Sequence, residues 1–131
     1  MRGRGNIRAE RGQTMVEFAM VLPILALLLF GVIQFGITFN NYVTLTDAVR
    51  AASRKAAVSR QSATRDSDIQ NALYDSASDL DKSKLPPPTV SSTWQHGDPV
   101  TVCATYPYDI NLIGMVVASG NLKSCTKERV E

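Results

Sequence analysis

The chain is 131 residues long, carries a formal net charge of +2 at pH 7, and contains one histidine and two cysteines. This length leaves room for one small domain, and a single histidine without a Cys-x-x-Cys motif argues against a metal site. The basic excess lies in the first dozen residues, and no basic stripe with interleaved aromatic side chains follows it, which argues against a nucleic-acid-binding protein.

Residues 1–12 form a polar leader rich in glycine and arginine. The leader contains one acid, Glu10, against four arginines, and it shows no helical periodicity. Basic residues beside a membrane span favour the cytoplasmic side. We therefore expect the N-terminus to be cytoplasmic and the chain beyond the membrane to be extracytoplasmic.

Residues 13–39 form an apolar run that predicts a transmembrane helix. From Phe18 to Phe39 the only conventionally polar side chains are Gln34 and Thr38. At about 1.5 Å of rise per residue, such a helix crosses roughly 30 Å of hydrocarbon. No small-x-small cleavage pattern closes the run, so we expect a retained single-pass anchor rather than a secretory signal.

Two further features describe this helix. Pro23 removes one backbone hydrogen bond inside the apolar run and predicts a kink, either a tolerated bend or a site of local melting. Beyond the membrane, apolar residues recur at steps of three and four to about Val58, so residues 40–60 are expected to continue the helix outside the membrane. The alanine-rich stripe of this continuation can pack on the following domain or against a neighbouring copy.

Residues 61–131 predict a small extracytoplasmic domain. A break at residues 59–64 precedes a second, shorter amphipathic helix that ends near Leu80, and three consecutive prolines then impose an extended connector. From Thr89 onward the apolar pattern has a period of two, which indicates strands. The expected fold class is therefore α+β, with a long N-terminal helix, a second short helix and a small antiparallel sheet.

The strand pattern predicts a hairpin and a third strand. Residues 89–94 and 100–106 alternate on either side of a turn at residues 96–99. Pro107 is expected to end the second strand. Residues 110–118 are read as an apolar crossover, and residues 121–130 as a returning third strand.

A disulfide and a set of packed aromatic side chains are expected in the sheet. Cys103 and Cys125 form an even pair in a small domain outside a membrane, which favours a disulfide over two free thiols. Such a bridge would stabilise the fold by about 3 kcal/mol. Trp94, Tyr106 and Tyr108 are interpreted as cross-strand core packing rather than as a ligand-binding aromatic patch.

No residue pattern predicts catalysis. His96 lies in a turn without a second ligand nearby, and Asp75, Asp79 and Asp81 lack the glycine-centred spacing of a calcium loop, so both are read as solvated. No serine or threonine lies in a nucleophile-elbow pattern. We expect no enzymatic activity, no metal, no cofactor and no small-molecule substrate.

Glu17 is the residue that most needs a partner, because an isolated carboxylate drawn into hydrocarbon costs several kcal/mol. In one interpretation it lies at the membrane interface, where it snorkels or stays protonated. In the other, the bond between Gly12 and Gln13 is cut, and the new α-amine pairs with Glu17 of its own chain or of a neighbouring subunit.

The order Gly12, four residues, Glu17 and Phe18, followed by an apolar helix with Pro23, resembles the processing site of Tad (Flp) pilus prepilins. RGQTMVEFAMVLPILALLLFGVIQFG is similar to the TadE-type pseudopilins, as is AVRAASRKAA further along. The resemblance implies a pilin-like fold, cleavage after Gly12 by a membrane aspartyl peptidase, and a need for Glu17 in processing or assembly. Major Tad pilins usually carry tyrosine after the glutamate, so Phe18 and the added domain favour the minor, TadE-like class or a TadG-like relative.

The combined expectation is a minor pseudopilin that acts in assembly of a Tad-type adhesive pilus or a related secretion apparatus. Its expected partners are a prepilin peptidase, other pilins and pseudopilins, the membrane proteins of the Tad assembly complex and the lipid bilayer. It is expected in the bacterial cytoplasmic membrane, with its domain in the periplasm or at the cell surface. The alternative is an uncleaved membrane anchor that carries an extracytoplasmic binding or adhesion module.

Overall fold

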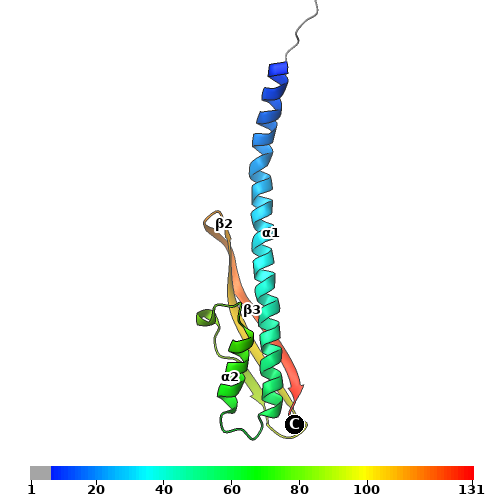
Figure 1. The fold of residues 1–131 in the computed structure, drawn as a ribbon, viewed down its shortest axis with the longest axis vertical. Coiled ribbons are helices and arrows are strands. Elements are labelled where there is room, and N and C mark those ends of the chain that lie inside the picture. The colour runs from blue at the N-terminus through cyan, green and yellow to red at the C-terminus, as the bar shows by residue number, and fades with distance from the viewer. Residues whose placement is uncertain (1–6) are drawn as a thin grey trace, which may run out of the picture.

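A computed structural model describes residues 7–131 of the chain, with side chains from residue 12 onward. The elements, in chain order, are α1 (Ile7–Val58), α2 (Arg65–Ser76), the 3-10 helix η1 (Lys82–Lys84), β1 (Thr89–Ser92), β2 (Pro99–Leu112) and β3 (Met115–Arg129). Figure 1 shows that the C-terminal half of α1 lies beside α2 and the sheet, whereas its N-terminal half extends beyond them. The expected α+β fold is confirmed.

Helix α1 is longer at its start than the sequence predicted. It begins at Ile7, so the second half of the predicted leader is helical, and only the first six residues of that leader lie outside the described residues. The leader shows no helical periodicity, but an existing helix extends at little cost into arginine and glutamate, which are good helix formers. The helix continues through Pro23 and ends at Val58, as predicted.

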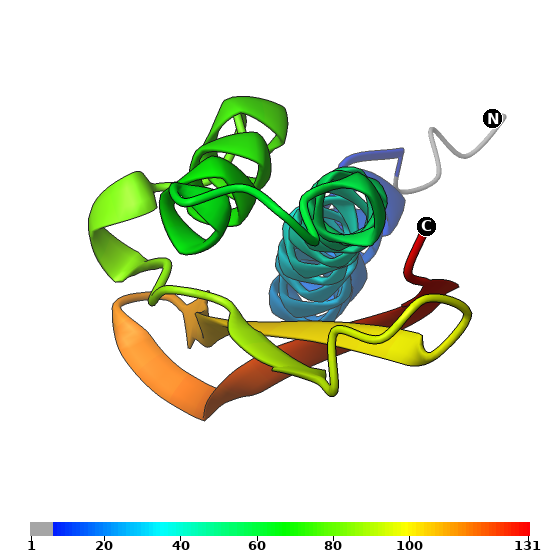
Figure 2. The ribbon, with the colours of Figure 1, turned by 90° about the horizontal axis from the view of Figure 1, so that it is seen from below.

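The C-terminal part of α1 forms the centre of the hydrophobic core. Leu45, Ala48, Val49, Ala52 and Ala56 are fully buried, at the steps of three and four that the sequence showed. The stripe therefore packs on the domain of its own chain. Figure 2 shows the two helices together on one face of the sheet, with α1 seen end-on.

The rest of the core comes from α2 and the inner face of the sheet. Ile69 and Leu73 of α2 are fully buried, as are Val100 and Val102 of β2. Along β2 the buried residues alternate with more exposed ones, which is the period expected of a strand with one face on the core. Two helices and one sheet face thus enclose a single core.

The sheet has the order β1-β2-β3 with both pairs antiparallel. Strand β2 runs through Pro107, so the prediction that this proline ends the strand was wrong. Because β1 pairs with β2 only as far as Cys103, the stretch of β2 beyond it has one free edge. A proline is tolerated at a free edge because no neighbouring strand needs its missing N–H.

The predicted crossover at residues 110–118 is instead the tip of a β2–β3 hairpin. Leu112 pairs with Met115, and the two residues between them, Ile113 and Gly114, have φ values of 51° and 83°. Positive φ at both central residues is what a two-residue type I′ turn requires. β3 therefore starts at Met115, six residues before the predicted third strand.

The predicted disulfide is confirmed. Cys103 on β2 and Cys125 on β3 are register partners, and they are bridged. The predicted core role of the aromatic residues is confirmed for Tyr106, which is buried, while Trp94 packs partly against the core. Trp94 lies outside the strand, at φ 58°, with the Arg65 guanidinium carbon 3.9 Å from its ring centroid.

We predict that Leu45→Ala destabilises the domain by about 2–5 kcal/mol, because it removes a fully buried side chain and leaves a cavity. Leu28→Ala, the same change on the same helix, serves as the control because Leu28 is 63% exposed. Urea unfolding of the two detergent-solubilised variants, followed by Trp94 fluorescence, measures the free energy of unfolding of each. Equal midpoints for the two variants would contradict the placement of Leu45 in the core.

A second prediction concerns the bridge, which closes a sequence separation of 22 residues. The double change Cys103→Ser and Cys125→Ser should lower the free energy of unfolding by about 3 kcal/mol, because the unfolded chain regains the entropy of the open loop. The same urea titration measures this, and adding a reductant to the unchanged chain is the control. Thiol alkylation of both cysteines in the folded, unreduced chain would show that the bridge is absent.

Candidate functional site

The candidate site is the N-terminal half of α1, whose side chains contact little of the chain itself. All seventeen large apolar side chains from Met15 to Phe39 are 47–72% exposed. The helix is long and apolar enough to cross a membrane, and none of its most apolar window is buried by the protein. Exposed leucine and phenylalanine on every side of a helix fit a lipid environment and not water. The structure is thus consistent with single-pass membrane anchoring.

The predicted cleavage site lies within this helix. Gly12 and Gln13 both have helical backbone, one turn or more after the helix start at Ile7. A side-chain β-carbon placed on Gly12 would meet nothing within 4 Å, so the glycine is not required by packing. The peptide bond between Gly12 and Gln13 is therefore open to a partner from the outside but is held in a helical conformation.

Glu17 is exposed on α1, one helical turn after Gln13. Its Oε1 accepts a hydrogen bond of 3.3 Å from the Gln13 side-chain amide. Because that amide is neutral, the hydrogen bond brings no positive charge to the carboxyl group. No cationic side chain among residues 12–131 lies within salt-bridge distance of it. The carboxylate thus retains its capacity to pair with a cation from elsewhere.

Phe18 and Pro23 complete the predicted set on α1. Phe18 follows Glu17 and is 58% exposed, so it is available to lipid or to another subunit. Pro23 lies four residues after Ala19, whose carbonyl loses its helical donor there. The structure brings Gly12, Gln13, Glu17 and Phe18 together within two turns of helix, and it places Pro23 beyond them in the apolar run.

The polar side chains in the second half of the apolar run face the β2–β3 hairpin. Gln34 and Thr38, with Asn41 just after the run, line a groove whose other wall is Lys84, residues 106–109 and Asn111. Thr38 also donates a hydrogen bond of 3.0 Å to the Gln34 carbonyl. No residue pattern predicts this contact, because it depends on how far the hairpin extends along α1.

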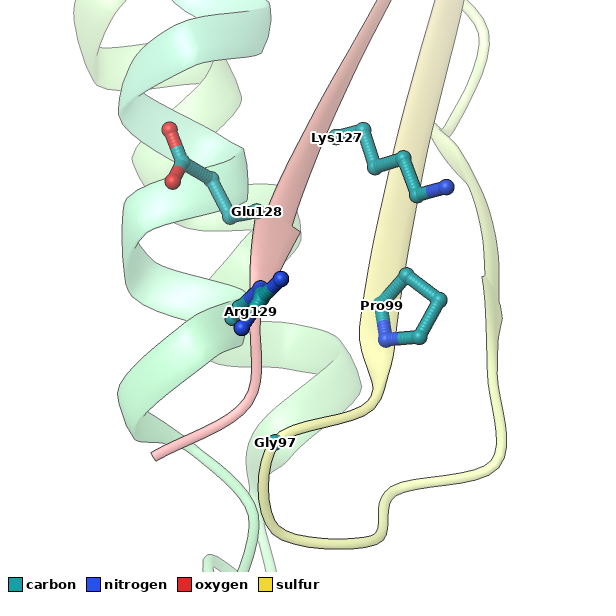
Figure 3. Close-up of a pocket in the computed structure, with 5 residues that line it drawn as sticks. All are labelled: Gly97, Pro99, Lys127, Glu128 and Arg129. Atoms are coloured by element: carbon teal, nitrogen blue, oxygen red, sulfur yellow. The ribbon is translucent and has the colours of Figure 1, made fainter.

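A second concave surface has charged residues in its lining but does not bring them together. A pocket at the other end of the sheet is lined by Gly97, Pro99, Lys127, Glu128 and Arg129. Figure 3 shows that Glu128 points toward α1, whereas Lys127 and Pro99 lie on the side of β2, so the charged groups do not converge. Among the described residues there is no group of three histidine, cysteine or acidic side chains that could hold a metal ion.

One acidic residue after α2, Asp81, has a structural role. Asp81 caps η1, since its Oδ1 accepts hydrogen bonds from the Ser83 hydroxyl at 2.6 Å and the Ser83 backbone N–H at 3.0 Å. These bonds favour the charged form and hold the pKa of Asp81 below the usual value of an aspartate side chain. His96 is exposed, as expected of a turn residue.

Comparison with known families gives one result. Residues 12–54 match the TadE family model, described as TadE-like protein. The match begins at Gly12 and takes in Glu17, Phe18, the apolar run and most of the core-facing stripe, but it leaves out α2 and the sheet. The resemblance predicted from the sequence is confirmed over this segment. No curated protein and no solved structure matches the chain.

The cap predicts a pH dependence. Because the folded-state pKa of Asp81 is depressed, its contribution to stability is present above the unfolded pKa and is lost as the pH falls through the folded one. Asp81→Asn should therefore remove part of the loss of stability seen between about pH 5 and pH 3. Thermal unfolding across that interval measures the effect. Asp79→Asn is the control, since Asp79 accepts no hydrogen bond within residues 12–131, and an equal effect of both variants would refute the cap.

Proposed function

We propose that the chain is a minor pseudopilin of a Tad-type adhesive pilus, cut after Gly12 by a prepilin peptidase. The observation that carries the proposal is the TadE-like match over residues 12–54, together with the exposure of Gly12, Glu17 and Phe18 on one helix. The work of the protein is structural: α1 docks or polymerises, and the domain is carried outside the membrane. No enzymatic turnover is proposed.

Cleavage supplies a cation for Glu17, which has no cationic partner among residues 12–131. A cut between Gly12 and Gln13 leaves an α-amine on Gln13, four residues before Glu17 and on the same side of the helix. The amine is cationic at neutral pH and can take the place of the neutral amide that now donates to the carboxylate. The partner amine belongs to the same chain or to a neighbouring subunit, and in the second case the pair sets the axial register of the assembly.

The cut requires a local opening of α1. The carbonyl of Gly12 is part of a helical turn, so a peptidase must unwind that turn before it can reach the bond. Glycine lowers the cost of this step, because it is about 1 kcal/mol poorer than alanine as a helix former. The position of the glycine near the helix start, where opening is cheapest, supports the proposed cleavage.

The proposed topology follows from the charge and the bridge. The basic leader stays cytoplasmic, α1 crosses the membrane once, and the domain lies in the periplasm or at the cell surface. The disulfide between Cys103 and Cys125 fits an oxidising compartment. The proposed partners are the prepilin peptidase, other pilins and pseudopilins, and membrane proteins of the Tad assembly complex.

We predict that the membrane-extracted protein begins at Gln13 when it is produced in a cell with a Tad system. Intact-mass spectrometry and N-terminal sequencing measure this. Removal of the peptidase gene should restore the chain with residues 1–12. A chain that keeps its leader in the presence of the peptidase, with full function, would support the uncleaved membrane anchor instead.

Glu17→Gln should reduce assembly of the processed chain by on the order of tenfold, because the amide keeps the shape but loses the charge that pairs with the amine. Co-purification with other pilus components measures assembly. Asp47→Asn is the matched control on the same helix, because the Asp47 carboxylate is 62% exposed and already pairs with Arg50 of its own chain. Normal assembly of the Glu17→Gln variant would contradict the proposed charge pair.

A further inference from the structure

The tip of the β2–β3 hairpin is strongly apolar and has no cover from the rest of the chain. Ile113, Met115, Val116 and Val117 are 70%, 69%, 59% and 55% exposed. Scattered exposed apolar residues are common, but a contiguous group at the end of a hairpin indicates a contact surface. The core does not account for it, because the buried cluster ends at Tyr106 on β2.

The charged residues of the hairpin lie at its base, and none lies at its tip. Between Asp109 on β2 and Lys123 on β3 the chain INLIGMVVASGNL contains no charged residue. Asp109 lines the same groove as Lys84, so two charges of opposite sign lie at the base of the tip. A charge-free apolar segment that ends at charged and polar residues is the pattern of a membrane interface.

The tip lies at the depth of the transmembrane part of α1. The groove places residues 106–109 and Asn111 beside Gln34, Thr38 and Asn41, so Asp109 is level with the end of the apolar run. The turn at Ile113 is four residues further along β2, about 14 Å at roughly 3.4 Å per residue, which equals about nine residues of helix. Figure 1 shows the tip pointing along α1 toward its N-terminal half and away from α2.

From this geometry we propose that the hairpin tip inserts into the outer leaflet of the membrane that α1 crosses. The proposal rests on the membrane span of α1. Lipid is the occupant because the apolar surface of the tip is continuous in depth with that of α1, whose exposed leucines and phenylalanines already require hydrocarbon. The anchor therefore has two contact points with the bilayer, a spanning helix and an inserted tip.

The backbone limits how deep the tip enters. β2 beyond Cys103 and the outer side of β3 are free edges with unpaired N–H and C=O groups. Such edges are not tolerated in the hydrocarbon core, but they are satisfied by water and headgroups at the interface. The tip side chains thus lie among the headgroups and the first carbons of the acyl chains, as interfacial anchors do. The part of α1 beside the groove, which carries Gln34 and Thr38, then lies above the tip and outside the hydrocarbon.

The test uses the full chain with single cysteines labelled by an environment-sensitive fluorophore. Labelling is done without reductant, since Cys103 and Cys125 are bridged. The sites are Val116→Cys at the tip, Lys127→Cys at the exposed far end of β3, and Leu28→Cys in the apolar run of α1. Each labelled protein is reconstituted in phosphatidylcholine and phosphatidylglycerol vesicles, with or without lipids brominated near the top of the acyl chain. The Leu28 label is also measured with lipids brominated near the end of the acyl chain, because Leu28 lies in the middle of the apolar run. Trp94 fluorescence checks that each variant folds.

The emission maximum of the label at Val116 should shift to shorter wavelength in vesicles, and the label should lose more than about half of its emission intensity in brominated lipid. The label at Lys127 should lose no intensity. Quenching of the Leu28 label with none at Val116 would overturn the insertion and leave the membrane span standing. Absence of quenching at both would overturn the span itself. A Val116 label that is shielded from aqueous iodide but not quenched by bromine would show a protein contact, such as a second copy, and would also overturn the proposal.

Discussion

One unbroken helix has to satisfy two environments, and the rest of the molecule depends on this constraint. Up to Phe39, α1 exposes apolar side chains on every side, and from Leu45 onward it keeps only a stripe that the domain buries completely. Fewer than two helical turns separate these two parts. Because no flexible linker lies between them, any tilt or rotation of the membrane segment moves the domain with it.

The composition of the stripe explains how so small a domain holds so long a helix. Ala48, Ala52 and Ala56 leave room for α2 and the sheet to approach the helix axis, while Leu45 and Val49 fill the space between them. The chain end completes the contact: Val130 is buried, and the Glu131 backbone N–H donates to the Ala57 carbonyl at 3.0 Å. The chain end follows β3, and the disulfide joins β3 to β2. Together they hold β3, which is the edge strand opposite β1, against the C-terminal end of α1.

The sequence predicted those parts of the fold that depend on a regular period. The apolar run, the stripe to Val58, the first hairpin and the cysteine pair all follow from spacing, and each is present. The long second hairpin was missed for two physical reasons. Pro107 normally ends a strand, and its free edge could not be known before the sheet was assembled. The turn uses Ile113 and Gly114 in place of Asn-Gly or Asp-Gly, and a β-branched residue at positive φ is not expected from sequence.

In the candidate site, too, the sequence predicted what depends on local spacing and missed what depends on contacts between distant segments. Gly12, Gln13, Glu17 and Phe18 were found from sequence because their relation is a matter of spacing on one helix. The groove formed by Gln34, Thr38 and the hairpin was not, because it joins segments about seventy residues apart. In the proposed pseudopilin, a subunit that leaves the bilayer has to transfer the exposed apolar residues of α1 and of the hairpin tip to protein neighbours. Because the hairpin lies beside α1, one neighbouring helix can contact both surfaces, so the proposed lipid-facing surface would also be the contact surface of the proposed assembly.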